Sequence, residues 1–447
     1  MDATLPPELK IGTAEAEHAF RKPVGNTRKN LKYCTADGVC AMPWVALSLP
    51  GSYITAGLLN SFFNVGPFWF GVVAAMPPLA NGCHIFLMPF FARFMKIRDM
   101  VLSFGWLNLG AWISALVGIA FLPVNEPDTA GLFFAILYSI ISLSSSLMMI
   151  AWTAWAADFV PERLRGRYFG KRNLYGKVSA ILFMLLSIAI LTYLNASREA
   201  YLALILLAII GRMISLMMIH LIESPDPTGG SISQQGWLHE IRALHKHSDL
   251  IRFMLFGSLT GFWLAAAGTI GALYALNDLG ASPAMFTTFF LTSSIAGAVF
   301  LPFWGRFIDR RGATPVILIT LTVWRLSDIG WIFMTPDTLY WMYAVWFSGG
   351  AMGLGYALAI FTLLLKLTPA NSRSAGISLN LTCTSLAGAL APFTVGVLVS
   401  RALKFGLTHA SAYRMGMAVC IVGTLLSLLM LPRMKPHSRP FRRVRIG

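Results

Sequence analysis

The chain has 447 residues, of which 56% are hydrophobic and 12% are charged, and its formal net charge is +16. Soluble domains carry about twice that fraction of charged residues, so the composition excludes a soluble globular protein. It also excludes an intrinsically disordered chain, because 13% of the residues are aromatic and can bury apolar surface. The composition is that of a polytopic membrane protein.

Apolar stretches long enough to cross a bilayer as helices follow one another along the chain. In order they centre on residues 39–60, 67–91, 100–122, 130–157, 174–194, 200–221, 251–276, 284–304, 314–334, 338–365, 375–400 and 411–431. Turn-forming clusters such as Asn125–Asp128 and Thr335–Asp337 separate them. The sequence therefore predicts an all-α membrane protein with twelve transmembrane helices.

The distribution of Lys and Arg predicts the orientation of these helices. With both termini in the cytoplasm, 29 of the 35 basic residues lie in inner segments, four lie outside and two lie within spans. The positive charge then faces the anionic inner leaflet of a bilayer, and no nucleic acid is needed to explain it. The expected location is the cell membrane, most simply the cytoplasmic membrane of a bacterium.

The two halves of the chain repeat each other. Pro89–Arg98 aligns without gaps with Pro302–Arg311, and the spacing of Pro161 and Arg165 returns at Pro369 and Arg373. Both matches have nearly the same offset, which indicates two six-helix bundles in parallel orientation. The predicted organisation is a cytoplasmic tail at 1–36, bundles at 37–221 and 251–431, a cytoplasmic loop at 222–250 between them, and a basic cytoplasmic tail at 432–447.

Two repeated bundles around a mid-membrane cavity are the architecture with which secondary transporters expose a site to each side in turn. The segment Gly305–Gly312, between the eighth and ninth spans, resembles the loop signature of the major facilitator superfamily. Through span number, repeat and loop motifs, the resemblance covers residues 37–431 and implies the 6+6 fold of that family. The first-half copy departs from the signature at Ala92 and Lys96, so a latch built on the acidic residue is expected only in the second half.

The signature predicts gating contacts on the inner side of the membrane. Its motif residues are Gly305, Asp309, Arg310 and Gly312, and the further charges expected to form and break pairs there are Arg93, Asp158, Arg165 and Arg373. Asp309 can face the start of the eleventh span, where a helix N-terminus favours negative charge. The alternative is that these charges only set the orientation.

By the same resemblance, the first, fourth, seventh and tenth spans line the cavity. Aromatic, hydroxyl and amide side chains in these spans and in the eleventh would suit a small organic solute. The candidates are Trp44, Ser48, Tyr53, Ser145, Trp152, Trp263, Trp346 and Asn380. The alternative for the tryptophans is anchoring at the membrane interface, and for the small residues helix packing.

Ionisable side chains inside spans are costly, so they point to function. Three are candidates for coupling to an ion. Arg325 and Asp328 are three residues apart and share one helix face, so they form either a structural pair or a coupling pair. His84 is either a proton relay or a hydrogen-bonded interior histidine.

The sequence has no P-loop, nucleophile elbow or HExxH motif, so an ATP-driven pump or an enzyme is not expected. No metal, other cofactor or disulfide framework is expected either. We predict a monomeric secondary transporter of a small organic solute, a symporter coupled to a proton or to sodium. Two alternatives stay open: a scaffold or sensor that kept the fold without transport, and a drug/proton efflux antiporter.

Overall fold

The computed structural model describes residues 27–48, 52–91, 93–160, 162–223, 247–369 and 373–432. Over these ranges the regular elements are all helices, which confirms the predicted all-α class. Ten helices in the described part of the chain are long and apolar enough to cross a membrane, against the twelve that the sequence predicts.

The first predicted span is broken into short pieces and does not form one helix. The pieces are α2 (Thr27–Cys40), α3 (Met42–Leu47), α4 (Tyr53–Gly57) and a π-helix η2 (Leu58–Phe62). Helix α2 also begins well before residue 37, where the cytoplasmic tail was expected to end. Its polar residues find partners in the fold: Asn30 donates to the backbone carbonyl of Glu223 at the end of the sixth span.

The other predicted spans each correspond to a helix, although α8 begins at Glu162 and not near residue 174, and the ninth span is divided between α13 and α14. In the first half they are α5 (Pro67–Phe91), α6 (Ile97–Phe121), α7 (Pro127–Phe159), α8 (Glu162–Tyr193) and α9 (Arg198–His220). In the second half they are α11 (Ser248–Asn277), α12 (Pro283–Arg311), α13 (Ala313–Ser327), α14 (Gly330–Phe333), η3 (Pro336–Trp341), α15 (Met342–Leu367), α16 (Arg373–Lys404), α17 (His409–Ser427) and η5 (Leu428–Met430).

Local sequence signals fix several helix ends. Proline occupies the first turn of α7 and of α12, where its missing N–H costs no hydrogen bond. The Ser282 side chain accepts a hydrogen bond of 3.1 Å from the backbone N–H of Met285 and so caps α12. Gly312 ends the same helix with a φ of 86°, a left-handed conformation that favours glycine.

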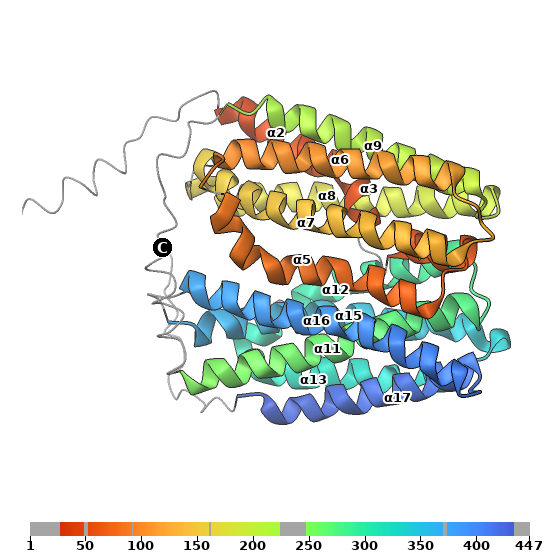
Figure 1. Ribbon diagram of the computed structural model, residues 1–447. Coiled ribbons are helices and arrows are strands. Elements are labelled where there is room, and N and C mark those ends of the chain that lie inside the picture. Colours follow the sequence, from red (N-terminus) through yellow and green to blue (C-terminus); the bar gives the residue numbers. More distant parts are fainter. Residues whose placement is uncertain are drawn as a thin grey trace, which may run out of the picture.

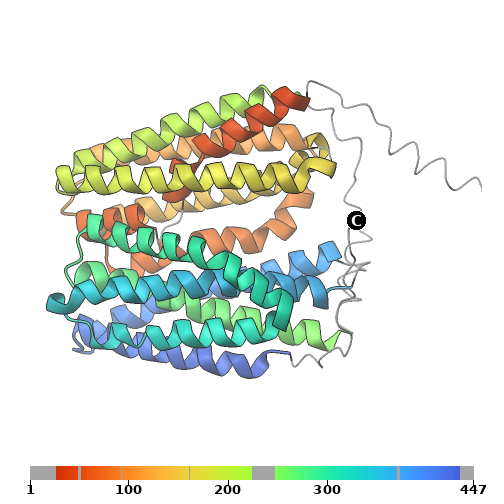
Figure 2. The same cartoon turned by 180° about the vertical axis from the view of Figure 1, so that it is seen from behind.

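The helices before residue 221 and those after residue 247 form two groups that lie side by side, with α5 and α16 packed along the boundary (Figure 1, Figure 2). Glycines allow this close approach. A Cβ atom on Gly71 would lie 2.3 Å from the carbonyl oxygen of Pro392, and one on Gly396 would lie 2.7 Å from that of Pro67.

A further contact joins the groups at the same end, where a Cβ on Gly57 would lie 2.9 Å from the Pro283 side chain. Gly57, Pro67 and Pro283 all lie next to the loops that join α4–η2 to α5 and α11 to α12. The two groups of helices are therefore packed together at the end of the molecule that carries these loops.

Candidate functional site

A cavity of about 590 Å³ lies at the boundary of the two groups and extends between the helices of the second group. The first group contributes Phe70, Ala74 and Pro78 of α5 and Lys177 of α8, while α11, α12, α13, α14, α15, α16 and α17 supply the rest of its wall. Of the four spans expected to line a cavity, the seventh and tenth (α11 and α15) do so in the described structure. The cavity is thus set mostly within the second half of the chain.

The ion pair of Arg325 and Asp328 lies in the wall of this cavity. Asp328 follows directly on the end of α13, and its Oδ2 lies 2.5 Å from Nη2 of Arg325. Both residues are buried, with exposed fractions of 2% for Arg325 and 5% for Asp328. The Nε and Nη1 atoms of Arg325 have no hydrogen-bond partner among the described residues.

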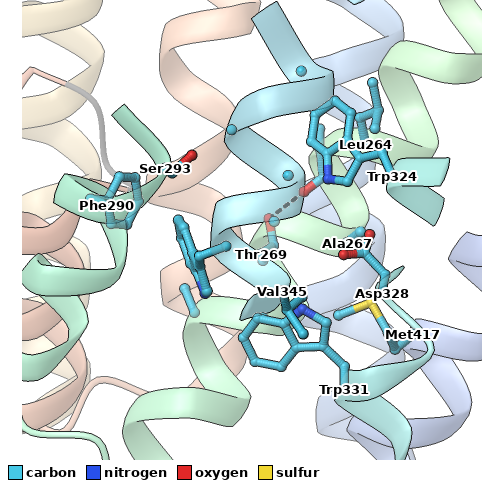
Figure 3. Close-up of a pocket in the computed structure, with 18 of the residues that line it drawn as sticks. Leu264, Ala267, Thr269, Phe290, Ser293, Trp324, Asp328, Trp331, Val345 and Met417 are labelled. Carbon is cyan, nitrogen blue, oxygen red and sulfur yellow. Dashed lines mark hydrogen bonds between the residues drawn. The ribbon is translucent and has the colours of Figure 1, made fainter. Parts of the chain in front are cut away.

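Tryptophans lie on both sides of Asp328, with Trp324 and Trp331 flanking it and Phe290 and Ser293 across the cavity (Figure 3). The Trp324 ring lies 4.7 Å below the guanidinium carbon of Arg325. Glycines of α15 make room for this ring, because a Cβ on Gly349 would lie 3.1 Å from its Nε1. The aromatic ring therefore has a fixed position beside the charged pair.

An aromatic cluster forms the wall opposite the ion pair. The ring of Trp346 lies 4.6 Å from that of Phe290 and 5.8 Å from that of Phe286, and all three line the cavity. The ring of Tyr53 on α4 packs 5.7 Å from Phe290, behind the wall. Trp346 is the member of the predicted cavity set that the structure places directly on the cavity.

Two other predicted cavity tryptophans lie against arginines instead. The Arg212 guanidinium is 4.4 Å from the centre of the Trp44 ring, and the Arg172 guanidinium is 4.4 Å from that of Trp152. Neither Trp44 nor Trp152 lines the cavity. Desolvated arginines gain several tenths of a kcal/mol or more, up to about 2 kcal/mol, from such a contact, which gives both rings a structural use.

The remaining predicted cavity residues also lie away from the cavity. Ser48 donates to the carbonyl of Trp44 at 3.0 Å, and Ser145 donates to that of Ile141 at 2.6 Å. Trp263 packs against Gly423 of α17. Asn380 is buried on α16, and its Oδ1 has no partner among the described residues.

A second buried charged cluster joins α2, α8 and α9, and the sequence analysis did not foresee it. Asp37 accepts from Nη2 of Arg172 at 3.1 Å and from Oγ of Ser215 at 2.7 Å. Arg212 in turn donates to Ser215 at 3.0 Å. The available signal was Asp37, the single acidic residue in the basic segment Thr27–Cys40 that leads into the first apolar run.

The predicted gating residues lie at helix ends. Asp309 and Arg310 are exposed in the last turn of α12, with Gly305 one turn earlier and Gly312 at its end, and Arg93 is exposed just after α5. Asp158, Arg165 and Arg373 belong to α7, α8 and α16, and His84 belongs to α5, but their side chains lie outside the described part of the structure. The gating roles and the role of His84 stay predictions.

Comparison with known proteins gives the family. The model of the Major Facilitator Superfamily matches residues 251–445, and no curated protein matches the chain. The match lies in the second half of the chain. This confirms the family resemblance of the Gly305–Gly312 signature, which lies in the matched part.

Solved structures of superfamily transporters share the fold of nearly the whole chain. The nucleoside transporter NupG superposes with a TM-score of 0.66 at 15% identity, covering 92% of this chain and 100% of its own. The xylose transporter XylE from E. coli, in an inward-open conformation, gives 0.65 at 12% identity, covering 92% and 98%. A bacterial homologue of the iron transporter ferroportin, in an inward-facing state, gives 0.67 at 13%, covering 91% and 97%.

Proposed function

We propose that this protein is a secondary active transporter of a small organic solute and works by alternating access. The observation that carries the proposal is the 590 Å³ cavity, which has walls from both groups of helices and a charged pair inside it. A cavity at the boundary of two bundles is exposed to one side or the other when the bundles rock. Its volume lies within the range of about 300–1,000 Å³ that small-molecule sites occupy.

The packing between the two groups of helices supports the state of this cycle that is closed on the outer side. The close contacts of Gly57, Gly71 and Gly396 join the groups at the end with the α11–α12 loop. In the orientation predicted from Lys and Arg, that end faces outward. The cavity would then open toward the cytoplasm, and separation of α5 from α16 would be the step that opens the outer side.

For coupling, we propose that the Arg325–Asp328 pair exchanges a proton or binds a cation during the cycle. Protonation of Asp328 would remove the negative partner of Arg325 and change what the cavity can bind. Tyr356 on α15 and Cys420 on α17 are the other titratable groups that interact with the pair. His84 stays a second coupling candidate, and sodium stays an alternative to the proton.

The proposed topology has twelve spans. Ten are the long apolar helices, and the other two are the broken segment α2–η2 and helix α5. Both termini are placed in the cytoplasm, with basic segments on the anionic inner leaflet of a bacterial cytoplasmic membrane. The proposal also includes the domain limits predicted from the sequence and a monomeric state. It includes gating by the charged residues predicted on the inner side, which are Asp309, Arg310, Arg93, Asp158, Arg165 and Arg373.

Transport into proteoliposomes tests the proposal. Purified protein is reconstituted, and uptake of labelled sugars, nucleosides, amino acids and carboxylates is measured with and without an inward proton or sodium gradient. We expect saturable uptake of one class that a gradient drives above equilibrium. Protein-free liposomes provide the background, and a protein inert toward every class and gradient would favour the scaffold alternative.

Direction distinguishes the remaining alternative. A drug/proton antiporter would take up a cationic dye when the proton gradient is reversed to point outward, and it would not accumulate solute with the inward gradient. The wall of the described cavity does not favour a cationic solute, since two of its three charged side chains, Arg325 and Lys177, are basic.

A further inference from the structure

The cavity wall offers hydrogen-bond donors that have nothing to donate to. Arg325 is 2% exposed, and its Nη2 is paired with Asp328. Its Nε and Nη1, and the Nε1 of Trp346, are buried without a partner among the described residues. Buried polar groups in native proteins are almost always hydrogen-bonded, so these donors call for an acceptor. Their residues line the cavity, and a solute there supplies the acceptor once a side-chain rotation brings the buried nitrogens to the cavity surface.

The charges along the wall have a net sign. Among the described residues that line the cavity, Arg325, Lys177 and Asp328 are the charged ones, which leaves one positive charge in excess. Lys177 comes from α8 in the first group and is exposed, while Arg325 comes from the second. Because Arg325 is paired with Asp328, the excess charge is that of the exposed Lys177, and a monoanion in the cavity would balance it.

The rest of the wall suits an apolar body. Trp324, Trp331, Trp346 and Phe290 present aromatic rings, and Gly268 leaves open space, since a Cβ built there meets nothing within 4 Å. Arginine donates to carboxylates in a plane, and the guanidinium of Arg325 lies over the Trp324 ring. The recognised molecule is then a compact acid: one carboxylate for the donors and a flat or cyclic body for the rings.

We propose that this cavity selects a monoanionic organic carboxylate, with Arg325 as the carboxylate-binding residue and Lys177 as a second source of positive charge. The inference rests on the proposed transport function, whose substrate class it specifies. Its key juxtaposition is the guanidinium of Arg325, with two free donor nitrogens, among tryptophan rings in one cavity.

Matched acid and amide pairs test the charge requirement on the full-length protein in detergent. Thermal unfolding is followed with phenylacetate against phenylacetamide, benzoate against benzamide, and cyclohexanecarboxylate against its amide. We expect at least one acid to raise the unfolding midpoint by several degrees at millimolar concentration, with its amide giving at most a tenth of that shift. If no acid exceeds its amide, the proposal is overturned.

Variants then test the residue. Arg325→Gln should abolish the acid shift measured against its own unliganded midpoint, Arg325→Lys should keep part of it, and Lys177→Gln should weaken acid binding several-fold. Arg306→Gln makes the same charge change at an exposed site on α12 and should keep the full shift. Because Arg325→Gln alone leaves Asp328 unpaired and can fail to fold, the neutral double variant Arg325→Gln/Asp328→Asn provides the second measurement. An acid shift that survives in Arg325→Gln or in the neutral double variant would refute the assignment.

Flux measurements separate this inference from the proposed function. Uptake of labelled phenylacetate and of labelled neutral solutes is followed in the same proteoliposomes. Transport of neutral solutes alone would leave the transporter proposal standing and overturn the carboxylate site. Acid binding that depends on Arg325, without flux of any solute, would support the site and count against transport.

Discussion

The guanidinium of Arg325 pairs with Asp328, three residues further along the chain, and both residues line the cavity. The exposed fractions of the two side chains are 3% and 8%. Each charge has therefore lost most of its contact with bulk solvent, and each depends on the other for compensation.

Removing one member of this pair should cost more than removing both. Arg325→Gln or Asp328→Asn alone leaves one buried charge without its partner, which typically costs about 3–5 kcal/mol. The double variant leaves no charge and should recover most of that loss. A double-variant cycle of unfolding midpoints checks this, and losses that simply add would show that the pair is not mutually dependent.

Filling the cavity should stop transport without unfolding the protein. Gly268 lies on α11 in the cavity wall, and a Cβ atom there meets nothing within 4 Å. Gly268→Leu should therefore place its side chain in the cavity and reduce uptake at least tenfold, while Gly268→Ala should reduce it mildly. Uptake into proteoliposomes is the measurement.

The control for this prediction is Gly110→Leu on α6, which also has open space but lies far from the cavity wall. It should leave uptake unchanged. If Gly268→Leu transports normally with an unchanged midpoint, the solute does not pass through this cavity.

A larger residue at Gly71 should force the outer contact apart. Its Cβ would lie 2.3 Å from the Pro392 carbonyl oxygen, so α5 and α16 must separate to accept Gly71→Val. We expect a membrane-impermeant maleimide added outside to label a cysteine at Ser294, in the cavity wall, faster in this variant. The experiment uses a background in which the five native cysteines are replaced, since all five are free thiols.

Gly170→Val is the matched control, because a Cβ at Gly170 on α8 meets nothing within 4 Å. Labelling should stay at the background rate in that variant. Equal labelling of Ser294→Cys with and without the Gly71 substitution would mean that the α5–α16 contact does not close the cavity.

Asp278 gives a stability prediction that depends on pH. It lies just after α11, and burial raises the pKa of its carboxyl above the ordinary value, partly offset by the nearby His409. The end of a helix also disfavours negative charge. A raised pKa means that the folded state holds the proton more tightly, so this group stabilises the fold at low pH. That stabilisation is lost as the pH rises through the folded-state pKa.

Asp278→Asn should accordingly raise the unfolding midpoint at pH 7, and the gain should shrink as the pH falls toward about 4, near the ordinary carboxyl pKa. Asp337→Asn removes the same charge from an exposed position after α14 and serves as the control. A gain that is constant across this pH range would show that the carboxyl of Asp278 is not destabilised by its surroundings.

Hydropathy was sufficient to predict the long helices, whereas the family came from the resemblance of the Gly305–Gly312 segment to a known loop signature. Runs of apolar residues form helices in a bilayer because their backbone groups must bond within the segment. The Arg325–Asp328 pair could also be predicted from the sequence, because two residues three apart on a helix share a face whatever packs around them.

What escaped prediction depends on contacts between distant segments. Ser215 donates to Asp37 from 178 residues away, and no local pattern shows that α2 packs against α9. Lys177 was not among the predicted cavity residues, yet it lines the cavity from α8, a helix that packs against α12 of the second group.

Trp44 and Trp346 were both predicted to line the cavity, but in the structure only Trp346 of the two does so. Trp44 is 4% exposed beneath Arg212, whereas Trp346 lines the cavity with its indole N–H free of any described partner. Trp44→Leu should therefore lower the unfolding midpoint through loss of its packing and of a cation–π contact worth about 0.5–2 kcal/mol, with KM for uptake unchanged.

Trp346→Leu should do the reverse, raising KM several-fold with a smaller change in the midpoint, because its ring faces the solute more than the core. Each variant is thus the control for the other, since both replace tryptophan with leucine. A raised KM in Trp44→Leu at an unaltered midpoint would show that Trp44 contacts the solute. The binding site would then lie between the two bundles, not mainly within the second.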